Sequence, residues 1–161
     1  MFRQLVLKKY KIKANFEYKI ESEEGDIEIV AYDEDKKAGS LTITVQYVDS
    51  EKSEHSFPFG AYVEQPFFDD ISDHEYVINI QDLSVEKEYQ KKGIASELMK
   101  KGMAEIKSRY PNVPVYINAS PYGGKANISL DALTNFYKKF GFKVLTKYSE
   151  YRNALLWRDK A

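Results

Sequence analysis

The sequence predicts a single α/β domain with a mostly antiparallel central sheet and two main helices. Three observations carry this prediction. Apolar and polar residues of the N-terminal third alternate with the two-residue period of half-exposed strands. Residues 76–110 then read as a strand, a tight loop and a long amphipathic helix. Residues 111–161 begin at a proline-containing break and read as a strand, a second helix and a C-terminal hairpin.

Composition is typical of a globular protein. The 161 residues fit one domain, 1–161, and 43% hydrophobic with 30% charged residues excludes a disordered or membrane-embedded chain. The N-terminus lacks the apolar core of a signal peptide, and no apolar run is long enough to span a bilayer. With no cysteine, a disulfide framework, a thiolate metal site and a cysteine nucleophile are excluded. We therefore expect a cytoplasmic protein with no membrane partner and no metal.

The net charge of −1 gives no overall attraction to nucleic acid or to anionic membranes. The first predicted strand, residues 10–20, has lysines along its polar face. Its apolar face consists of Tyr10, Ile12, Ala14, Phe16, Tyr18 and Ile20. The lysines are most simply the solvated face of that strand, so a nucleic-acid partner is not favoured.

Residues 1–48 are predicted to form an antiparallel β-meander. Turn residues at 23–26 precede a second strand, and a polar turn over 33–39 precedes a third. Residues 49–75 then form a long, acidic and aromatic-rich segment, which is unusual as a plain connection in a compact domain. It is either a functional loop or a packed loop anchored by its aromatic side chains.

A short loop joins the strand over 76–85 to the helix that begins at Ile94. It contains Gln90, Gly93 and Ala95 at a spacing that places small residues where the helix starts. Backbone N–H groups at that position have no intrahelical partner, and the helix dipole adds partial positive charge. Since a small residue also lets a phosphate approach the backbone, the loop predicts an anion site.

A second motif lies near the end of the second predicted helix, which covers residues 130–140. The string from Asn135 to Phe142 places Phe136 and Tyr137 on the apolar face of this helix. Gly141 follows where a helix commonly ends in a left-handed cap.

Together, the two motifs resemble those of the GNAT superfamily of acyl-CoA-dependent N-acyltransferases. The loop is similar to that family's Gln/Arg-x-x-Gly-x-Gly/Ala signature, and the helix end resembles its Phe-Tyr-x-x-x-Gly-Phe string. The resemblance covers roughly residues 76–157. It implies a GNAT-like fold in which the strands over 76–85 and 115–119 are parallel and splay apart. It also implies acetyl-CoA as cosubstrate and direct transfer of its acetyl group to a primary amine in a ternary complex.

The resemblance further implies which residues contact the cosubstrate. They belong to the strand backbone, to the phosphate loop and to the linker before the second helix: Leu83, Val85, Gln90, Lys91, Lys92, Gly93, Ile94, Ala95 and Asn127. Tyr137 matches the tyrosine that acts as general acid towards the departing thiolate.

The base is less directly indicated. Family members that use one place it eleven or nine residues before the first position of the loop, and these positions hold Asn79 and Gln81. Neither side chain takes a proton at neutral pH, so we expect them to position a water that relays it. Nearby ionisable alternatives are His74, Glu75 and Asp82, of which Asp82 needs a β-bulge to face the acceptor.

One departure from the family concerns the acceptor. A typical member has two helices between its first and second strands, whereas this chain has only the turn around Gly25. The acceptor wall is then expected from residues 49–75, whose acidic side chains favour a cationic amine. Two other functions stay open: a non-catalytic acyl-CoA-binding or protein-interaction module, and modification of a nucleobase amine. The acceptor, the acyl chain and the oligomeric state, a homodimer included, are not determined by the sequence.

Overall fold

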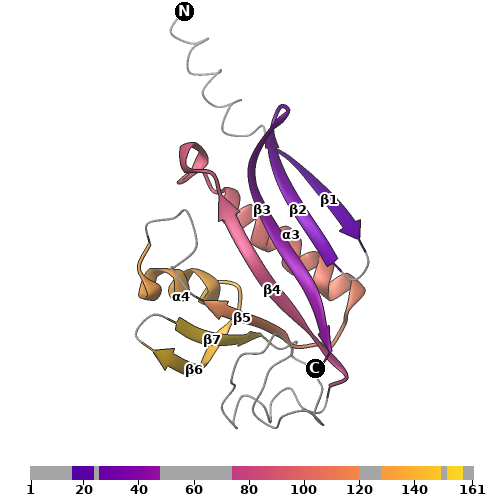
Figure 1. The fold of residues 1–161 in the computed structure, drawn as a ribbon, viewed down its shortest axis with the longest axis vertical. Helices are drawn as coiled ribbons and strands as arrows, with labels where there is room; N and C mark the ends of the chain where they lie inside the picture. Colours follow the sequence, from indigo (N-terminus) through magenta and orange to yellow (C-terminus); the bar gives the residue numbers. More distant parts are fainter. Residues whose placement is uncertain (1–15, 24–25, 48–73, 120–127, 150–151, 158–161) are drawn as a thin grey trace, which may run out of the picture.

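The computed structural model describes residues 16–23, 26–47, 74–119, 128–149 and 152–157. Within them, seven strands form one mixed sheet in the order β1-β2-β3-β4-β5-β7-β6 (Figure 1). The strands are β1 (Glu17–Glu23), β2 (Asp26–Asp33), β3 (Lys36–Tyr47), β4 (Tyr76–Val85), β5 (Val115–Ala119), β6 (Lys143–Ser149) and β7 (Arg152–Trp157). The helical elements are the 3-10 turn η1 (Lys87–Tyr89), α3 (Ile94–Arg109) and α4 (Leu130–Lys138). The predicted fold class is confirmed.

Strands β1 to β3 form the predicted antiparallel meander, and β4 pairs antiparallel with β3. β1 is described from Glu17 onwards, and the part of the predicted first strand before residue 16 lies outside the described residues. β3 begins at Lys36, inside the turn predicted over 33–39. That prediction was too long, because Glu34 takes a positive φ of 54° and the chain reverses within two residues.

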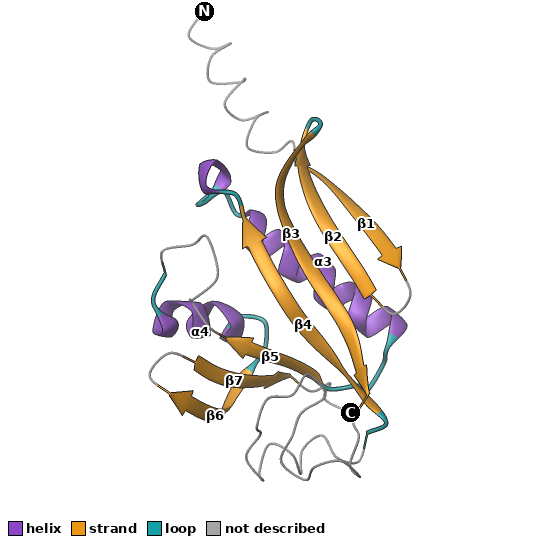
Figure 2. Cartoon of the chain, in the orientation of Figure 1, coloured by secondary structure: helices purple, strands orange, loops and turns teal. Residues whose placement is uncertain are grey.

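Helix α3 packs on β2, β3 and β4 and crosses one face of the meander (Figure 2). The helical period places seven residues on the apolar face of this helix. Six of them are buried, and Ala95 is half-buried: the buried ones are Ile94, Leu98, Met99, Gly102, Met103 and Ile106. Burying each large apolar side chain of this kind stabilises the fold by about 1.5–3 kcal/mol. Ile20 was predicted on the apolar face of the first strand but is 45% exposed. It lies on the edge strand β1, beyond the three strands on which α3 mainly packs.

Helix α4 packs against β5 and β7, which follow β4 in the sheet on the side away from β3. Ser129 caps it, since the Ser129 hydroxyl accepts a hydrogen bond from the Ala132 N–H at 3.1 Å. The helix ends at Lys138 rather than at the predicted Phe140, because the last amides bond three residues back instead of four. The C-terminal hairpin of β6 and β7 completes the sheet.

Several predicted features fall outside the described residues. They are residues 48–73, which include most of the long acidic segment, and residues 120–127 before α4. The division of the domain into segments 1–48, 49–75, 76–110 and 111–161 stays a prediction. No helix in the described part of the chain is both long and apolar enough to cross a membrane.

Gly39 of β3 lies against both β4 and the start of α3. A Cβ atom there would be 2.8 Å from the Ser84 backbone oxygen and 3.3 Å from Cγ2 of Ile94. Because that oxygen moves only if the strands separate, we expect Gly39→Ala to lower the free energy of unfolding by about 1–3 kcal/mol. Urea unfolding measures this, with the exposed Lys37→Ala on the same strand as control. An unchanged midpoint would show that β3 and β4 separate here without cost.

Candidate functional site

Strand β4 has a neighbour on its β5 side for only part of its length. The parallel pairing runs from Ile78 opposite Val115 to Ile80 opposite Ile117. β4 then continues to Val85, while β5 runs in a different direction, so the two strands diverge (Figure 2). The splayed parallel pair that the family resemblance implied is therefore present, and it leaves one edge of β4 open.

A β-bulge lies at the point of divergence. Ile80 and Asp82 are opposite consecutive residues of β3, so Gln81 between them is an extra residue. A bulge of this kind shifts the alternation of side chains by one position. Asp82 consequently lies on the same face of β4 as Asn79, opposite the face covered by α3.

The backbone beyond the bulge directs polar groups to the open edge. The Glu86 N–H donates to the Ala38 carbonyl at 2.8 Å, towards β3. Because this direction alternates along a strand, the N–H and C=O groups of Val85 and Leu83 point away from β3. The Gln90 amide Nε2 donates to the Val85 carbonyl at 3.2 Å, which ties the following loop to this edge.

That loop contains two residues with positive φ, Lys91 at 64° and Gly93 at 83°. Gly93 is the N-cap of α3, and within the described residues no side chain caps this helix. A Cβ at Gly93 would meet nothing within 4 Å, so the backbone conformation rather than lack of room favours glycine. The amides of the first turn of α3 and the helix dipole together favour an anion here.

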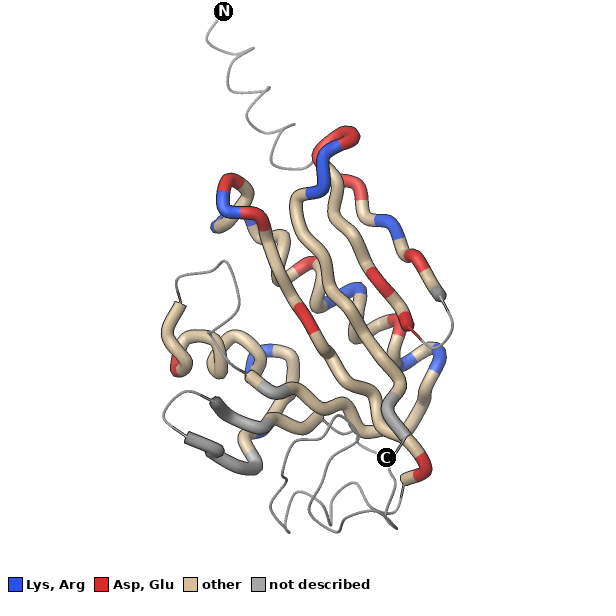
Figure 3. Tube along the Cα trace, viewed as in Figure 1, with Lys and Arg blue, Asp and Glu red and all other residues tan. Residues whose placement is uncertain are grey.

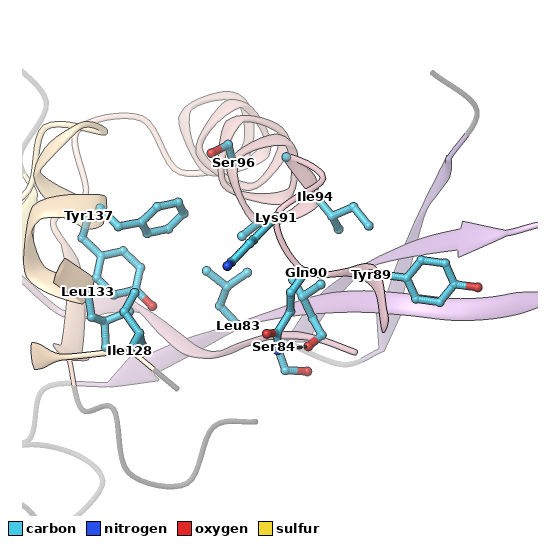
Figure 4. A pocket seen from close by; sticks show the side chains of 14 residues that line it. Leu83, Ser84, Tyr89, Gln90, Lys91, Ile94, Ser96, Ile128, Leu133 and Tyr137 are labelled. Carbon is cyan, nitrogen blue, oxygen red and sulfur yellow. Dashed lines mark hydrogen bonds between the residues drawn. The ribbon is translucent and has the colours of Figure 1, made fainter. Parts of the chain in front are cut away.

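These elements enclose a cavity of about 500 Å³ between the end of β4, the loop, the start of α3 and α4 (Figure 4). Its lining is mostly apolar, with polar backbone groups at the loop. The lining residues are Leu83, Ser84, Val85, Tyr89, Gln90, Lys91, Gly93, Ile94, Ala95, Ser96, Ile128, Leu133, Phe136 and Tyr137. A cavity of this form suits an extended ligand with an anionic end.

Tyr137 lines the cavity from α4, across from Leu83 on β4 (Figure 4). Its side chain is 6% exposed, and its ring packs edge-on against Phe136 and Phe142 at centroid distances of 5.4 and 6.1 Å. Burial, and to a smaller extent the charge of Asp82, raise the pKa of Tyr137 to about 12. The hydroxyl therefore remains a hydrogen-bond donor at neutral pH.

The structure brings together seven of the nine residues predicted to contact a cosubstrate, and the remaining two are Lys92 and Asn127. The Lys92 Nζ lies 5.4 Å from the centroid of the Tyr89 ring, and Lys92 is not among the lining residues. Asn127 lies outside the described residues. The seven lining residues come from β4, the loop and the first turn of α3, which are continuous in sequence.

The candidate bases are distributed along β4. Asn79 is buried, and Gln81 is exposed in the bulge, but neither lines the cavity. His74 and Glu75 precede β4, at the end of the strand away from the cavity. Among the ionisable candidates, Asp82 is next to the lining residue Leu83, and its charge contributes to the raised pKa of Tyr137. The water relay through Asn79 and Gln81 stays a prediction.

Six lining residues were not predicted as part of the site: Ser84, Tyr89, Ser96, Ile128, Leu133 and Phe136. Helical spacing could have indicated Leu133 and Phe136, which share a face with Tyr137. Ser84 lies between two predicted contacts. Tyr89 carried no sequence signal, because contacts with distant segments fix its position.

Comparisons with known proteins agree with this architecture. The profile described as an acetyltransferase (GNAT) domain matches residues 24–144. The comparison with curated proteins gives no match.

Solved structures of similar fold include Escherichia coli ElaA, which is 16% identical, with a TM-score of 0.51 over 84% of this chain and 70% of its own. The PaiA N-acetyltransferase of Thermoplasma acidophilum in complex with coenzyme A is 11% identical, with a TM-score of 0.54 over 98% and 70%. Arylalkylamine N-acetyltransferase 2 of Aedes aegypti is 15% identical, with a TM-score of 0.53 over 81% and 72%. Identities this low show a shared fold. The profile match, however, starts just before β2 and ends in β6, so it includes the loop, the cavity-lining residues and α4. The chain therefore belongs to the GNAT acetyltransferase family.

Proposed function

We propose that the protein is an acetyl-CoA-dependent N-acetyltransferase that acts on the primary amine of an acceptor. The observation that carries this proposal is the cavity, which leads from backbone amides at the start of α3 to Tyr137 on α4. Acetyl-CoA has phosphates towards one end and a thioester at the other. Family membership supports the choice. Two structures of similar fold also support it: the Thermoplasma acidophilum enzyme in complex with coenzyme A, and Arabidopsis thaliana Naa50 in complex with a CoA-containing bisubstrate analogue.

In this proposal the cosubstrate lies along the open edge of β4. The N–H groups of Gly93, Ile94 and Ala95 hold the pyrophosphate, and Gln90, Lys91 and Lys92 surround it. The backbone groups of Leu83 and Val85 pair with the pantetheine arm, which the direction of the β4 amides supports. Asn127 stays a proposed contact from the linker before α4.

The acceptor must lose a proton before its nitrogen attacks the thioester carbon. We assign this step to Asp82, acting directly or through water held by Gln81 and Asn79. Asp82 has an exposed carboxylate on the face of β4 opposite α3, and its charge contributes to the raised pKa of Tyr137. An exposed carboxylate also attracts a protonated amine, which favours a cationic acceptor. With no cysteine in the chain, transfer proceeds by direct attack rather than through a cysteine acyl-enzyme.

The departing thiolate requires stabilisation, and Tyr137 provides the donor. A thiol has a pKa near 8.5, so full transfer of a proton from a hydroxyl whose pKa is about 12 is uphill by about 5 kcal/mol. Tyr137 therefore acts mainly by donating a hydrogen bond to the sulfur as negative charge develops. The proton that finally reaches the sulfur comes from the attacking amine or from water. This refines the general-acid role that the sequence predicts.

The proposal is tested first by calorimetric titration of the protein with acetyl-CoA. We expect binding by the wild type and a loss of at least roughly tenfold in affinity for Gly93→Val, because a β-branched side chain strains the positive φ and obstructs the amides. Gly93→Asn tolerates positive φ, so its affinity separates obstruction from strain. Binding without transfer to any amine would identify a non-catalytic acyl-CoA-binding module. No binding by the wild type would end the enzyme proposal.

Tyr137→Phe tests the donor role. We expect kcat to fall by about a hundredfold or more, with little change in acetyl-CoA affinity, because the lost hydrogen bond forms only as the thiolate develops. Steady-state kinetics with a reactive acceptor and direct titration measure the two effects separately. Tyr110→Phe deletes a hydroxyl at the end of α3 away from the cavity and serves as control. Unchanged turnover would remove Tyr137 from the mechanism.

The raised pKa of Tyr137 also makes stability depend on alkaline pH. The unfolded tyrosine loses its proton near pH 10, whereas the folded one holds it to about 12, so the contribution to stability is lost as the pH rises through this window. Between about pH 9 and about pH 11 the free energy of unfolding of the wild type should fall by about 1.3 kcal/mol more than that of Tyr137→Phe. Urea unfolding of both proteins at the two pH values measures the difference. Equal losses would contradict the raised pKa.

A further inference from the structure

The loop before α3 is in contact with the turn that joins β2 to β3. The Tyr89 hydroxyl donates a hydrogen bond to Asp33 Oδ2 at 2.7 Å, across 56 residues of sequence. Tyr89 is 7% exposed and also lines the cavity. This hydrogen bond raises the pKa of Tyr89, so its hydroxyl stays protonated and donating at neutral pH. A residue of the cavity wall is thus connected to a segment that does not line the cavity.

Three further side chains surround the ring of Tyr89. The Nζ atoms of Lys36 and Lys92 lie 5.7 and 5.4 Å from its centroid, and Phe16 packs against it edge-to-face at 5.8 Å. Lys36, which follows the turn, also pairs with the Glu88 carboxylate of η1. Figure 3 shows both charged segments, the turn and the loop, at the same end of the sheet. The ring is therefore held from the β2–β3 side, from the loop itself and from the residue that precedes β1.

The backbone that follows Tyr89 needs such support. Lys91, a non-glycine residue, has a φ of +64°, and Gly93 has a φ of +83°. A non-glycine residue in this conformation is strained and persists only where the surroundings hold it. The loop is fixed at one point by Gln90, whose side chain bonds to the Val85 carbonyl, and at a second point by Tyr89.

We propose that Asp33 and Tyr89 are positioning residues of the cosubstrate site, which hold the loop over 89–93 in the conformation that presents its amides to phosphate. The inference rests on the proposed function, because it assumes that the loop receives the phosphates of CoA. It assigns the β2–β3 turn a role in cosubstrate affinity. A purely structural contact would instead affect global stability and all ligands of the cavity alike.

The test compares two probes, CoA and pantetheine, which lacks the phosphates and the nucleotide. Tyr89→Phe and Asp33→Ala are each expected to raise the Kd of CoA roughly tenfold, as expected for loss of a hydrogen bond to a charged partner, and to leave the Kd of pantetheine unchanged. The double variant should lose no more than either single variant, because the two side chains act through one contact. Tyr32→Phe, a hydroxyl deletion one residue before Asp33, serves as the matched control. Urea unfolding of each variant establishes that it is folded.

The outcomes separate the inference from the function on which it rests. Weakened CoA binding with unchanged pantetheine binding and non-additive variants supports the positioning role. CoA affinity equal to the wild type in folded Tyr89→Phe and Asp33→Ala overturns it while leaving the proposed function intact. Equal losses for both probes also overturn it, since the contact would then act on the whole cavity. If Asp33→Ala does not fold, Asp33→Asn replaces it, and a Kd for CoA equal to that of the wild type in both Asp33→Asn and Tyr89→Phe overturns the inference. Failure of the wild type to bind CoA would contradict the proposed function itself.

Discussion

The divergence of β4 from β5 is the constraint on which the site depends. If the two strands paired along their full length, the polar groups of Leu83 and Val85 would be used by β5 and the cavity would close. Leaving such groups at an open edge is costly unless another donor or acceptor, or water, meets them. The side chain of Gln90 meets one of them at the Val85 carbonyl. The bulge at Gln81 coincides with the divergence and sets which side chains face each side of the strand.

The β-meander helps to support the loop before α3. α3 starts against β3, where Gly39 leaves space for Ile94, and the β2–β3 turn reaches Tyr89. The position of the helix start is therefore set by strands that come early in the chain, as well as by the strand that leads into the loop. Under the proposed function the meander therefore contributes to ligand binding, although none of the described residues of β1 to β3 lines the cavity.

Local patterns were sufficient to predict much of the fold and part of the site. The three- and four-residue spacing of apolar positions in α3 and the alternation in β2 and β3 reflect burial on one face, which sequence periodicity reports directly. The loop residues were predictable because the motif is continuous. The side of β4 that Asp82 faces was not, since it depends on pairing with β3, and the Asp33–Tyr89 contact joins residues far apart in sequence. Ile20 is exposed because α3 packs mainly on β2, β3 and β4 and not on β1. Which strands a helix covers cannot be read from a local sequence pattern.

In the proposed reaction one proton leaves the acceptor and another reaches the thiolate, and the structure separates the groups suited to these steps. Tyr137 on α4 is buried and holds its proton strongly, whereas Asp82 on β4 is an exposed carboxylate. The charge of Asp82 contributes to the raised pKa of Tyr137, and a cationic amine bound beside Asp82 offsets that contribution. Burial, which is the larger cause of the raised pKa, is not offset by the amine. The hydroxyl is then a somewhat stronger hydrogen-bond donor when an acceptor is present than when the site holds cosubstrate alone, which favours transfer to the amine.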